Sequence, residues 1–128
     1  MTRTVIRVLI VEDEPVFAKN MGTYLSRYGY EVGIANSGEA GLSKLETVKP
    51  DVIFLNLSMP EGMNGLDALS KIRAIDHDIK VIIMSGHGSP ELVVKAIAGG
   101  AFRYVTKPFS LSSMRQMVED AVREHPAA

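Results

Sequence analysis

The chain has 128 residues, and 14 lysines and arginines stand against 15 aspartates and glutamates, for a formal net charge of −1. This balance argues against direct nucleic-acid binding, which requires a clustered positive surface, and no apolar run is long enough to cross a membrane. The absence of cysteine excludes disulfides and thiolate metal sites, and with the lack of a signal-peptide pattern it leads us to expect a cytoplasmic protein.

The first half of the chain predicts three strands and two helices in alternation. Val5–Val11 contains a continuous Val/Ile/Leu patch, which is typical of a strand covered on both faces. Glu14–Tyr28 then places apolar residues on one helical face. Tyr30–Ala35 predicts the second strand, Ser37 is a suitable N-cap for the second helix, and Asp51–Leu55 predicts the third strand.

The second half continues the same alternation. Gly65–Ile75 has helical spacing, Lys80–Met84 predicts a buried strand, and Ser89 is a suitable cap for a short helix. Phe102–Val105 predicts the last strand, and Ser110 can cap the last helix. Five strand and helix pairs in alternation predict an α/β fold, a doubly wound parallel sheet with helices on both faces. We expect one domain over residues 1–124, followed by a short tail or linker stub at 125–128.

Polar residues follow four of the predicted strands, where a parallel sheet presents its ligand site. They are Glu12, Asp13, Asn56, Ser85 and Lys107. A carboxylate pair suits a hard cation such as Mg²⁺, while a lysine and a hydroxyl suit a phosphoryl group. The first strand is followed by "VEDEP" and not by the glycines of a nucleotide-binding loop, so the pattern favours a site for a cation and a phosphoryl group.

Four motifs in this order, "VEDE", "LNLSMP", "MSGHG" and "YVTKPF", resemble those of the receiver domain of bacterial two-component response regulators. The resemblance covers nearly the whole chain. It implies a flavodoxin-like (βα)5 fold in a single domain, with five flanking helices and the strand order 2-1-3-4-5. It also implies phosphorelay signal transduction, with a sensor histidine kinase or a phosphotransfer protein as partner.

The resemblance assigns a metal set and an acceptor position. Glu12 and Asp13 match the acidic pair that holds Mg²⁺, and Ser58 would offer its backbone carbonyl to the same ion. Asn56 matches the aspartate that accepts the phosphoryl group and that also ligates the metal. An amide nitrogen is a poor nucleophile, so we expect a phosphorylation-blocked form that does not catalyse its own phosphorylation and binds Mg²⁺ weakly or not at all.

The resemblance also assigns a switch. Ser85 matches the hydroxyl that contacts the phosphoryl group, Lys107 the lysine that pairs with its oxygens, and Tyr104 the aromatic residue that turns inward. The bond from Lys107 to Pro108 is cis in the family. The family's usual output surface for a further domain or a downstream protein is the face of the last two helices and the fifth strand, and an exposed Val93 or Val94 would strengthen its assignment here.

Several alternatives remain open at this point. Glu12 and Asp13 could be only an acidic helix start, and Asn56 only a strand-end residue that satisfies loop backbone groups. The chain could be a naturally phosphorylation-independent receiver that acts as a protein-protein interaction module. A small enzyme or nucleotide binder on the same architecture is a third hypothesis. The segment from Pro60 to Gly65 is one residue longer than usual in the family, and His87 is expected to be a solvated loop residue.

Overall fold

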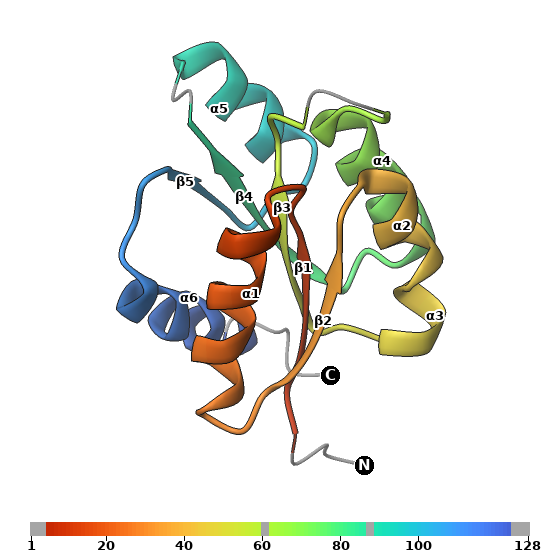
Figure 1. Ribbon diagram of the computed structural model, residues 1–128. Coiled ribbons are helices and arrows are strands. Elements are labelled where there is room, and N and C mark those ends of the chain that lie inside the picture. The colour runs from red at the N-terminus through yellow and green to blue at the C-terminus, as the bar shows by residue number, and fades with distance from the viewer. Residues whose placement is uncertain (1–4, 60–61, 87–88, 124–128) are drawn as a thin grey trace.

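The computed structural model describes residues 5–59, 62–86 and 89–123. Pro60, His87 and the expected tail at 125–128 therefore lie outside the described residues, as does the expected domain end at Glu124. Helices and strands alternate along the described chain, and the strands form one layer with helices on either side of it (Figure 1). No helix in the described ranges combines the length and the apolar character needed to cross a membrane.

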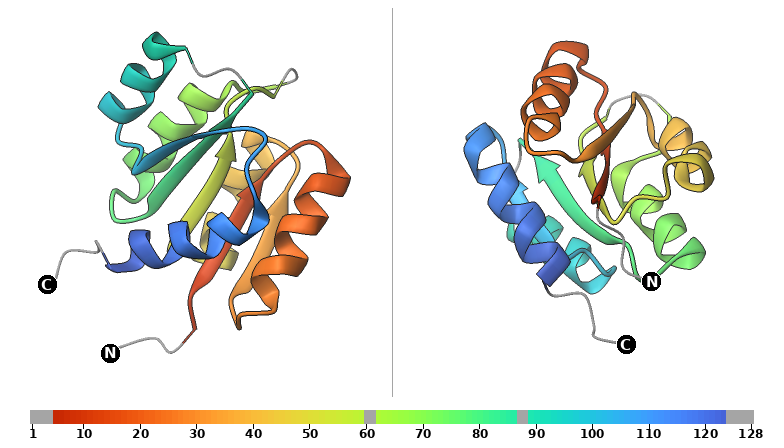
Figure 2. Two further views of the ribbon diagram at one scale, coloured as in Figure 1. Left: turned by 90° about the vertical axis from the view of Figure 1, so that its left-hand side faces the viewer. Right: turned by 90° about the horizontal axis from the view of Figure 1, so that it is seen from below.

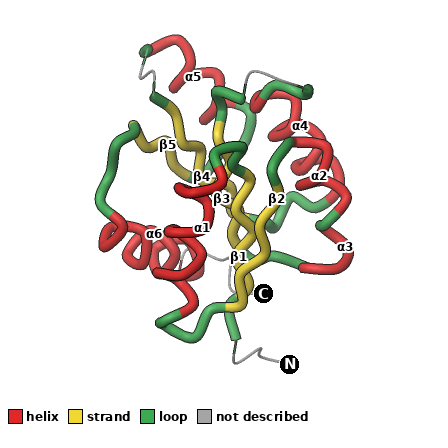
Figure 3. The backbone as a smooth tube through the Cα atoms, in the orientation of Figure 1, coloured by secondary structure: helices red, strands yellow, loops and turns green. Residues whose placement is uncertain are grey.

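Five parallel strands make a single sheet in the order β2-β1-β3-β4-β5, which confirms the predicted fold and strand order. The strands are β1 (Arg7–Val11), β2 (Glu31–Ala35), β3 (Val52–Asn56), β4 (Lys80–Ser85) and β5 (Arg103–Thr106). The central strand β3 is buried at all of its positions because helices cover both of its faces (Figure 3). The two edge strands, β2 and β5, are exposed or partly exposed at most positions, whereas β1 and β4 are partly exposed only at their first residues.

Within the described residues, six helices pack on the two faces of the sheet. They are α1 (Pro15–Ser26), α2 (Gly38–Ser43), α3 (Leu45–Val48), α4 (Gly65–Ile75), α5 (Pro90–Ala98) and α6 (Leu111–Arg123). α1 and α6 pack side by side on one face, where they form a core with Phe54 and Met84, whereas α2 to α5 cover the other face (Figure 2). The sheet therefore has two separate cores, and its strand ends lie between the two helical layers.

Prolines and serine caps begin three of the helices at the positions that the sequence predicted. Pro15 and Pro90 occupy the first turns of α1 and α5. The hydroxyl of Ser37 accepts a hydrogen bond from the Ala40 N–H at 3.0 Å, and that of Ser89 accepts one from the Leu92 N–H at 3.2 Å. These caps satisfy N–H groups that have no partner within the helix.

The helix expected after Ser37 differs from the prediction, because it is divided into α2 and α3 at Lys44. The Lys44 N–H donates to both the Ala40 and the Gly41 carbonyls, at 3.2 and 3.1 Å, so the turn tightens there. The side chain of the same residue reaches back to β2, where its ammonium donates to the Ile34 carbonyl. The expected count of five helices is therefore corrected to six.

The longer loop before α4 is tied to α2 in its described part. Gly62 has a left-handed φ of 79°, and the Met63 N–H donates to the Glu39 carboxylate at 2.9 Å. A Cβ atom at Gly65 would lie 2.6 Å from the Leu57 Cα, so only glycine allows α4 to begin this close to the end of β3.

Candidate functional site

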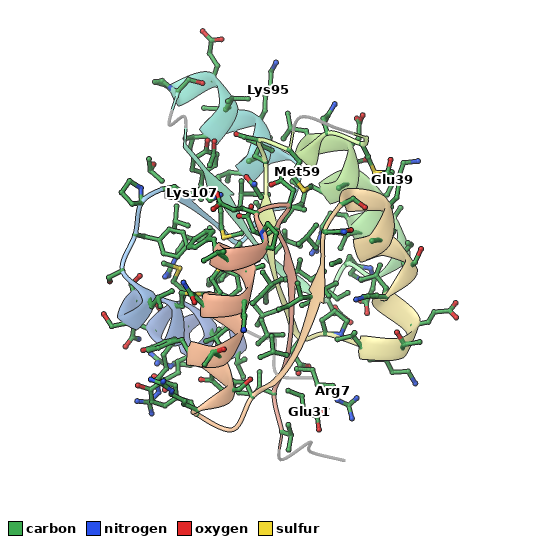
Figure 4. The ribbon with its side chains drawn as sticks, viewed as in Figure 1. Arg7, Glu31, Glu39, Met59, Lys95 and Lys107 are labelled. Atoms are coloured by element: carbon green, nitrogen blue, oxygen red, sulfur yellow. The ribbon has the colours of Figure 1, made fainter. Side chains whose placement is uncertain are left out.

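The carboxyl ends of β1, β3, β4 and β5 bring together the polar residues that the sequence singled out. Lys107 lies at this end of the sheet, opposite the end that carries Arg7 and Glu31 (Figure 4). Glu12, Asn56 and Ser85 follow or end buried strands and are themselves only 1%, 3% and 0% exposed. Buried polar groups of this kind are stable only when they are hydrogen-bonded, so their partners define the site.

The Glu12 carboxylate accepts three hydrogen bonds. Its Oε1 accepts a hydrogen bond from the Lys107 ammonium at 2.7 Å. Its Oε2 accepts from the Asn56 side-chain amide and from the Glu14 backbone N–H, both at 3.1 Å. The carboxylate charge is thus compensated by one cation and two neutral donors, which is the condition under which a buried charge is tolerated.

The amide of Asn56 points its nitrogen at the acidic pair. Nδ2 donates to Glu12 Oε2 at 3.1 Å and to Asp13 Oδ1 at 3.2 Å, and Oδ1 accepts from the Ser58 backbone N–H at 3.0 Å. Both ends of the amide are therefore used. The reverse orientation would set Oδ1 against two carboxylates, so the hydrogen bonds fix which atom is nitrogen.

Ser58 and Ser85 complete a closed chain of contacts. Their hydroxyl oxygens lie 3.2 Å apart, and the Ser85 backbone carbonyl accepts from the Lys107 N–H at 2.7 Å. The chain runs through Glu12, Asn56, Ser58, Ser85 and Lys107 and returns to Glu12, and we call it the hydrogen-bond ring. Mutually supporting bonds of this kind hold each member in one orientation.

Tyr104 and Pro108 lie beside this ring. Tyr104 is partly buried on β5 and packs against the core under α5, next to Ile83 in the strand register. The bond from Lys107 to Pro108 is cis, as expected. The seven predicted site residues therefore include five ring members, Asp13 bonded to the ring through Asn56, and Tyr104 outside it.

Two contributions were missing from the sequence prediction. The sequence assigned only the backbone carbonyl of Ser58, whereas its hydroxyl contacts Ser85. The Phe17 ring lies under the Lys107 ammonium, 4.9 Å from ring centre to nitrogen, and adds a cation–π contact. Helical spacing placed Phe17 on the inward face of its helix, but no sequence signal joins it to a lysine ninety positions away on another element.

The side chains of Glu12, Asp13 and Asn56 fit a magnesium ion only in part. Glu12 and Asp13 converge on one point with oxygen donors, which suits a hard cation. The atom of Asn56 at that point is an N–H donor, however, and within the described residues no group of three histidine, cysteine, aspartate or glutamate side chains could hold a metal. The two carboxylates fit the ion, and the amide as oriented does not.

The shifted pKa values lie away from the site. A hydrogen bond from Gln116, with Arg103 next to it, lowers the pKa of the Asp120 carboxyl. Burial raises the pKa of Tyr30, with the nearby Glu119 carboxylate adding to the effect. These groups belong to the surface between α1, β5 and α6, so they bear on stability and not on the strand-end chemistry.

Comparison with known proteins gives consistent matches. A sequence profile described as the response regulator receiver domain matches residues 8–119. The chain is 38% identical over 107 residues to the chemotaxis protein CheY of Thermotoga maritima, which covers 83% of this chain and 88% of that protein. It is 35% identical over 117 residues to the regulatory protein AtoC of Escherichia coli, of which it spans only 25%.

Among solved structures, a CheY-like response regulator receiver domain protein from Methanospirillum hungatei superposes with a TM-score of 0.90 at 27% identity. The alignment covers 95% of this chain and 97% of that one. The chain thus spans nearly the full length of some relatives and about a quarter of others, in which the matching part is one segment of a longer protein.

Proposed function

The chain belongs to the response regulator receiver domain family, and from this premise we propose that it is a receiver whose phosphoryl-accepting aspartate is replaced by Asn56, a phosphorylation-blocked form. The observation that carries the proposal is the placement of the Asn56 amide. It ends β3 beside the Glu12 and Asp13 carboxylates, and Ser85 and Lys107 lie on the same ring of contacts.

The chemistry of the amide explains the block. A carboxylate oxygen can attack phosphorus, but an amide nitrogen shares its lone pair with its carbonyl and is a weak nucleophile. In this site both N–H groups of Asn56 are directed at carboxylates, and its oxygen accepts from Ser58. No atom at this position is left in a state to accept a phosphoryl group, so the chain is expected not to catalyse its own phosphorylation.

Magnesium binding is proposed to be weakened in the same way. Glu12, Asp13 and the backbone carbonyl of Ser58 would hold the ion, and Asn56 would join them only after its amide turned its oxygen inward. That turn would cost the three hydrogen bonds of the amide. When bound, the cation would neutralise charge on phosphoryl oxygens next to the acceptor.

The proposed partners follow from the family. A sensor histidine kinase or a phosphotransfer protein would act on an aspartate-bearing parent. Output to a further domain or a downstream protein is proposed for the face of α5, β5 and α6. On this face Val94 of α5 is 65% exposed and Ile97 is 47% exposed, which supplies the apolar surface expected of a contact site, whereas Val93 is only partly exposed.

A second candidate function is a receiver that works without phosphorylation, as a protein-protein interaction module. One observation favours it. Among the described residues, no buried side-chain nitrogen or oxygen lacks a hydrogen-bond partner, so the site is complete with the amide in place. A site that is satisfied in this way needs no phosphoryl group to hold its resting conformation.

Phosphorylation with acetyl phosphate and Mg²⁺ tests the proposal. The chain, its Asn56→Asp variant and a control Asn64→Asp variant would be compared by intact mass. Asn64 is the N-cap of α4, and aspartate can also cap a helix, so the control makes the same chemical change outside the site. It removes one exposed hydrogen bond, from Asn64 Nδ2 to the Asp67 carboxylate. We expect one added phosphoryl group only in Asn56→Asp.

Two outcomes would contradict this reading. Labelling of Asn56 itself, after deamidated protein has been excluded by mass, would overturn the argument from amide chemistry. Failure of the Asn56→Asp variant to take up phosphoryl from acetyl phosphate would favour the phosphorylation-independent module.

A further inference from the structure

The outer side of the edge strand β2 carries backbone groups that point away from the sheet. The Glu31 N–H donates to the Ile6 carbonyl, and the Ala35 carbonyl accepts from the Glu12 N–H, so these two residues face β1. Residues of a parallel strand alternate in the direction of their N–H and C=O groups, so Val32 and Ile34 face outward. Within the described ranges, no strand pairs with this side (Figure 1).

Lys44 occupies part of this edge. Its ammonium donates to the Ile34 carbonyl from the junction of α2 and α3. A lysine over an edge strand is one of the ways in which proteins limit unwanted strand pairing. The side chain covers a single acceptor near the carboxyl end of β2, and the N–H and C=O of Val32 and the N–H of Ile34 point to the same side.

A groove lies on each face of the sheet beside this edge. One, of about 430 Å³, lies between β2 and α3 and is lined by Val32, Val48 and Lys49 among others. The other, of about 490 Å³, lies between β2 and α1 and is lined by Val32, Lys19 and Arg27 among others. An added strand would direct alternate side chains to opposite faces of the sheet, and the two grooves are placed to receive them.

Cations outnumber carboxylates around the edge. Lys19 and Arg27 line the α1 groove, and Lys49 and Arg7 line the α3 groove. Among the described residues, the one carboxylate that lines either groove is that of Glu31, which lies 3.2 Å from the Arg7 guanidinium (Figure 4). Since the whole chain has a net charge of −1, this concentration of cations is a local property of the edge.

We propose that the β2 edge binds an extended polypeptide segment with acidic side chains, which pairs with Val32 and Ile34 and sends its carboxylates into the two flanking grooves. Lys44 would leave the Ile34 carbonyl and pair with one of these carboxylates. A second copy of this chain is a poor occupant, because the same cations would face one another across the contact. The inference does not depend on the proposed function, since it uses no residue of the hydrogen-bond ring.

The experiment titrates the isotopically labelled chain with a peptide of about ten residues in which pairs of glutamates alternate with pairs of valines. Such a peptide spans one edge strand and, when extended, presents glutamates on both of its faces. Binding is followed by amide chemical shifts and hydrogen exchange. We expect the Val32 and Ile34 amides to shift and to exchange more slowly, and a peptide with lysine in place of glutamate to leave them unchanged.

A pair of double variants with equal charge change locates the effect. Lys19→Gln with Arg27→Gln removes both cations of the α1 groove, while Lys71→Gln with Lys95→Gln removes two exposed lysines from α4 and α5. We expect the Lys19 and Arg27 double variant to weaken peptide binding about tenfold or more, because it removes cations that would contact the peptide. The Lys71 and Lys95 double variant should change binding little, because these lysines lie outside both grooves.

Equal weakening in the two double variants would overturn the proposal, because it would indicate general charge attraction. Binding without slower exchange at Val32 and Ile34 would overturn it as well. So would self-association of the chain through β2 that the peptide does not displace.

Discussion

Two ion pairs lie at opposite ends of the sheet, and each joins a glutamate carboxylate to a cationic side chain in different surroundings (Figure 4). Lys107 and Glu12 are 2.7 Å apart, and the Glu12 side chain is 1% exposed. Arg7 and Glu31 are 3.2 Å apart, and their side chains are 33% and 62% exposed. Water screens the second pair and not the first, so a nearly identical contact is a structural requirement at one end and a minor surface feature at the other.

The buried pair also takes part in a larger arrangement. Glu12 accepts hydrogen bonds from Asn56 and Glu14 in addition to Lys107, so removing one partner leaves a charged group with unfilled bonds. Among the described residues, the one polar side-chain contact of Glu31 is the ion pair with Arg7. The comparison teaches that the distance between two charged atoms says little about stability until burial and further bonds are known.

Replacement of Lys107 should have the largest effect. Lys107→Met keeps the aliphatic stem and removes the ammonium, which leaves Glu12 buried without its cation. We expect a loss of about 3 kcal/mol in the free energy of unfolding, near the lower limit for a broken buried pair because the lysine itself is partly exposed. Urea denaturation measures it. If the free energy of unfolding falls as little as is expected for Arg7→Gln, the distinction between the buried and the exposed ion pair is wrong.

Asn56→Asp should have the next largest effect. It replaces two N–H donors with a third negative charge beside Glu12 and Asp13. Without divalent ions we expect a loss of about 1–2 kcal/mol from repulsion and unmade hydrogen bonds. Added MgCl₂ should restore stability, because a cation held only by the folded state stabilises it. Thermal unfolding with and without MgCl₂ measures both.

The Asn64→Asp variant is the matched control for that measurement. It should respond little to MgCl₂, since its site is a helix cap. If Asn56→Asp is as stable as the original chain without Mg²⁺ and does not respond to the ion, the assignment of Glu12 and Asp13 as a metal pair is wrong.

Replacement of Arg7 should have a small effect. Arg7→Gln removes the exposed ion pair with Glu31 and retains the backbone hydrogen bond of residue 7 to Asp51. The expected loss is below about 0.5 kcal/mol and should fall further in high salt. The urea midpoint at low and high ionic strength tests this. A loss near that of Lys107→Met would show that exposure does not separate the two pairs.

The smallest effect concerns the exposed network around Asp120. Bonds from Gln116 and Arg103 hold its pKa below the ordinary value of 3.8, so the charged form is favoured in the folded state. The stabilisation is complete above pH 3.8 and disappears as the pH falls through the lower pKa of the folded protein. Asp120→Asn should therefore lower the urea midpoint at neutral pH and not at pH values below that folded pKa. An equal difference at both would contradict the assignment.

The amino-acid sequence was enough to predict the order of strands and helices, the caps at Ser37 and Ser89, and the strand-end positions of Glu12, Asp13, Asn56, Ser85 and Lys107, whereas Ser58 and Tyr104 were assigned only by the family resemblance. These features follow from local patterns. Continuous apolar runs mark buried strands, cap residues mark helix starts, and the residue after each strand must lie at one edge of a parallel sheet. The prediction of one unbroken helix after Ser37 was wrong, because the tightened turn at Lys44 has no pattern in the sequence.

The contacts among the site residues depend on the tertiary structure and could not be predicted from the sequence. The sequence placed Asn56 beside Glu12 and Asp13, but which amide atom faces them depends on the Ser58 N–H, whose position is set by the chain leaving β3. The contact of the Ser58 and Ser85 hydroxyls joins the ends of two strands, and Lys107 reaches Glu12 across ninety-five positions of the chain. Such contacts depend on packing directions that no local periodicity contains, so the residues of the site were predictable and its hydrogen-bond ring was not.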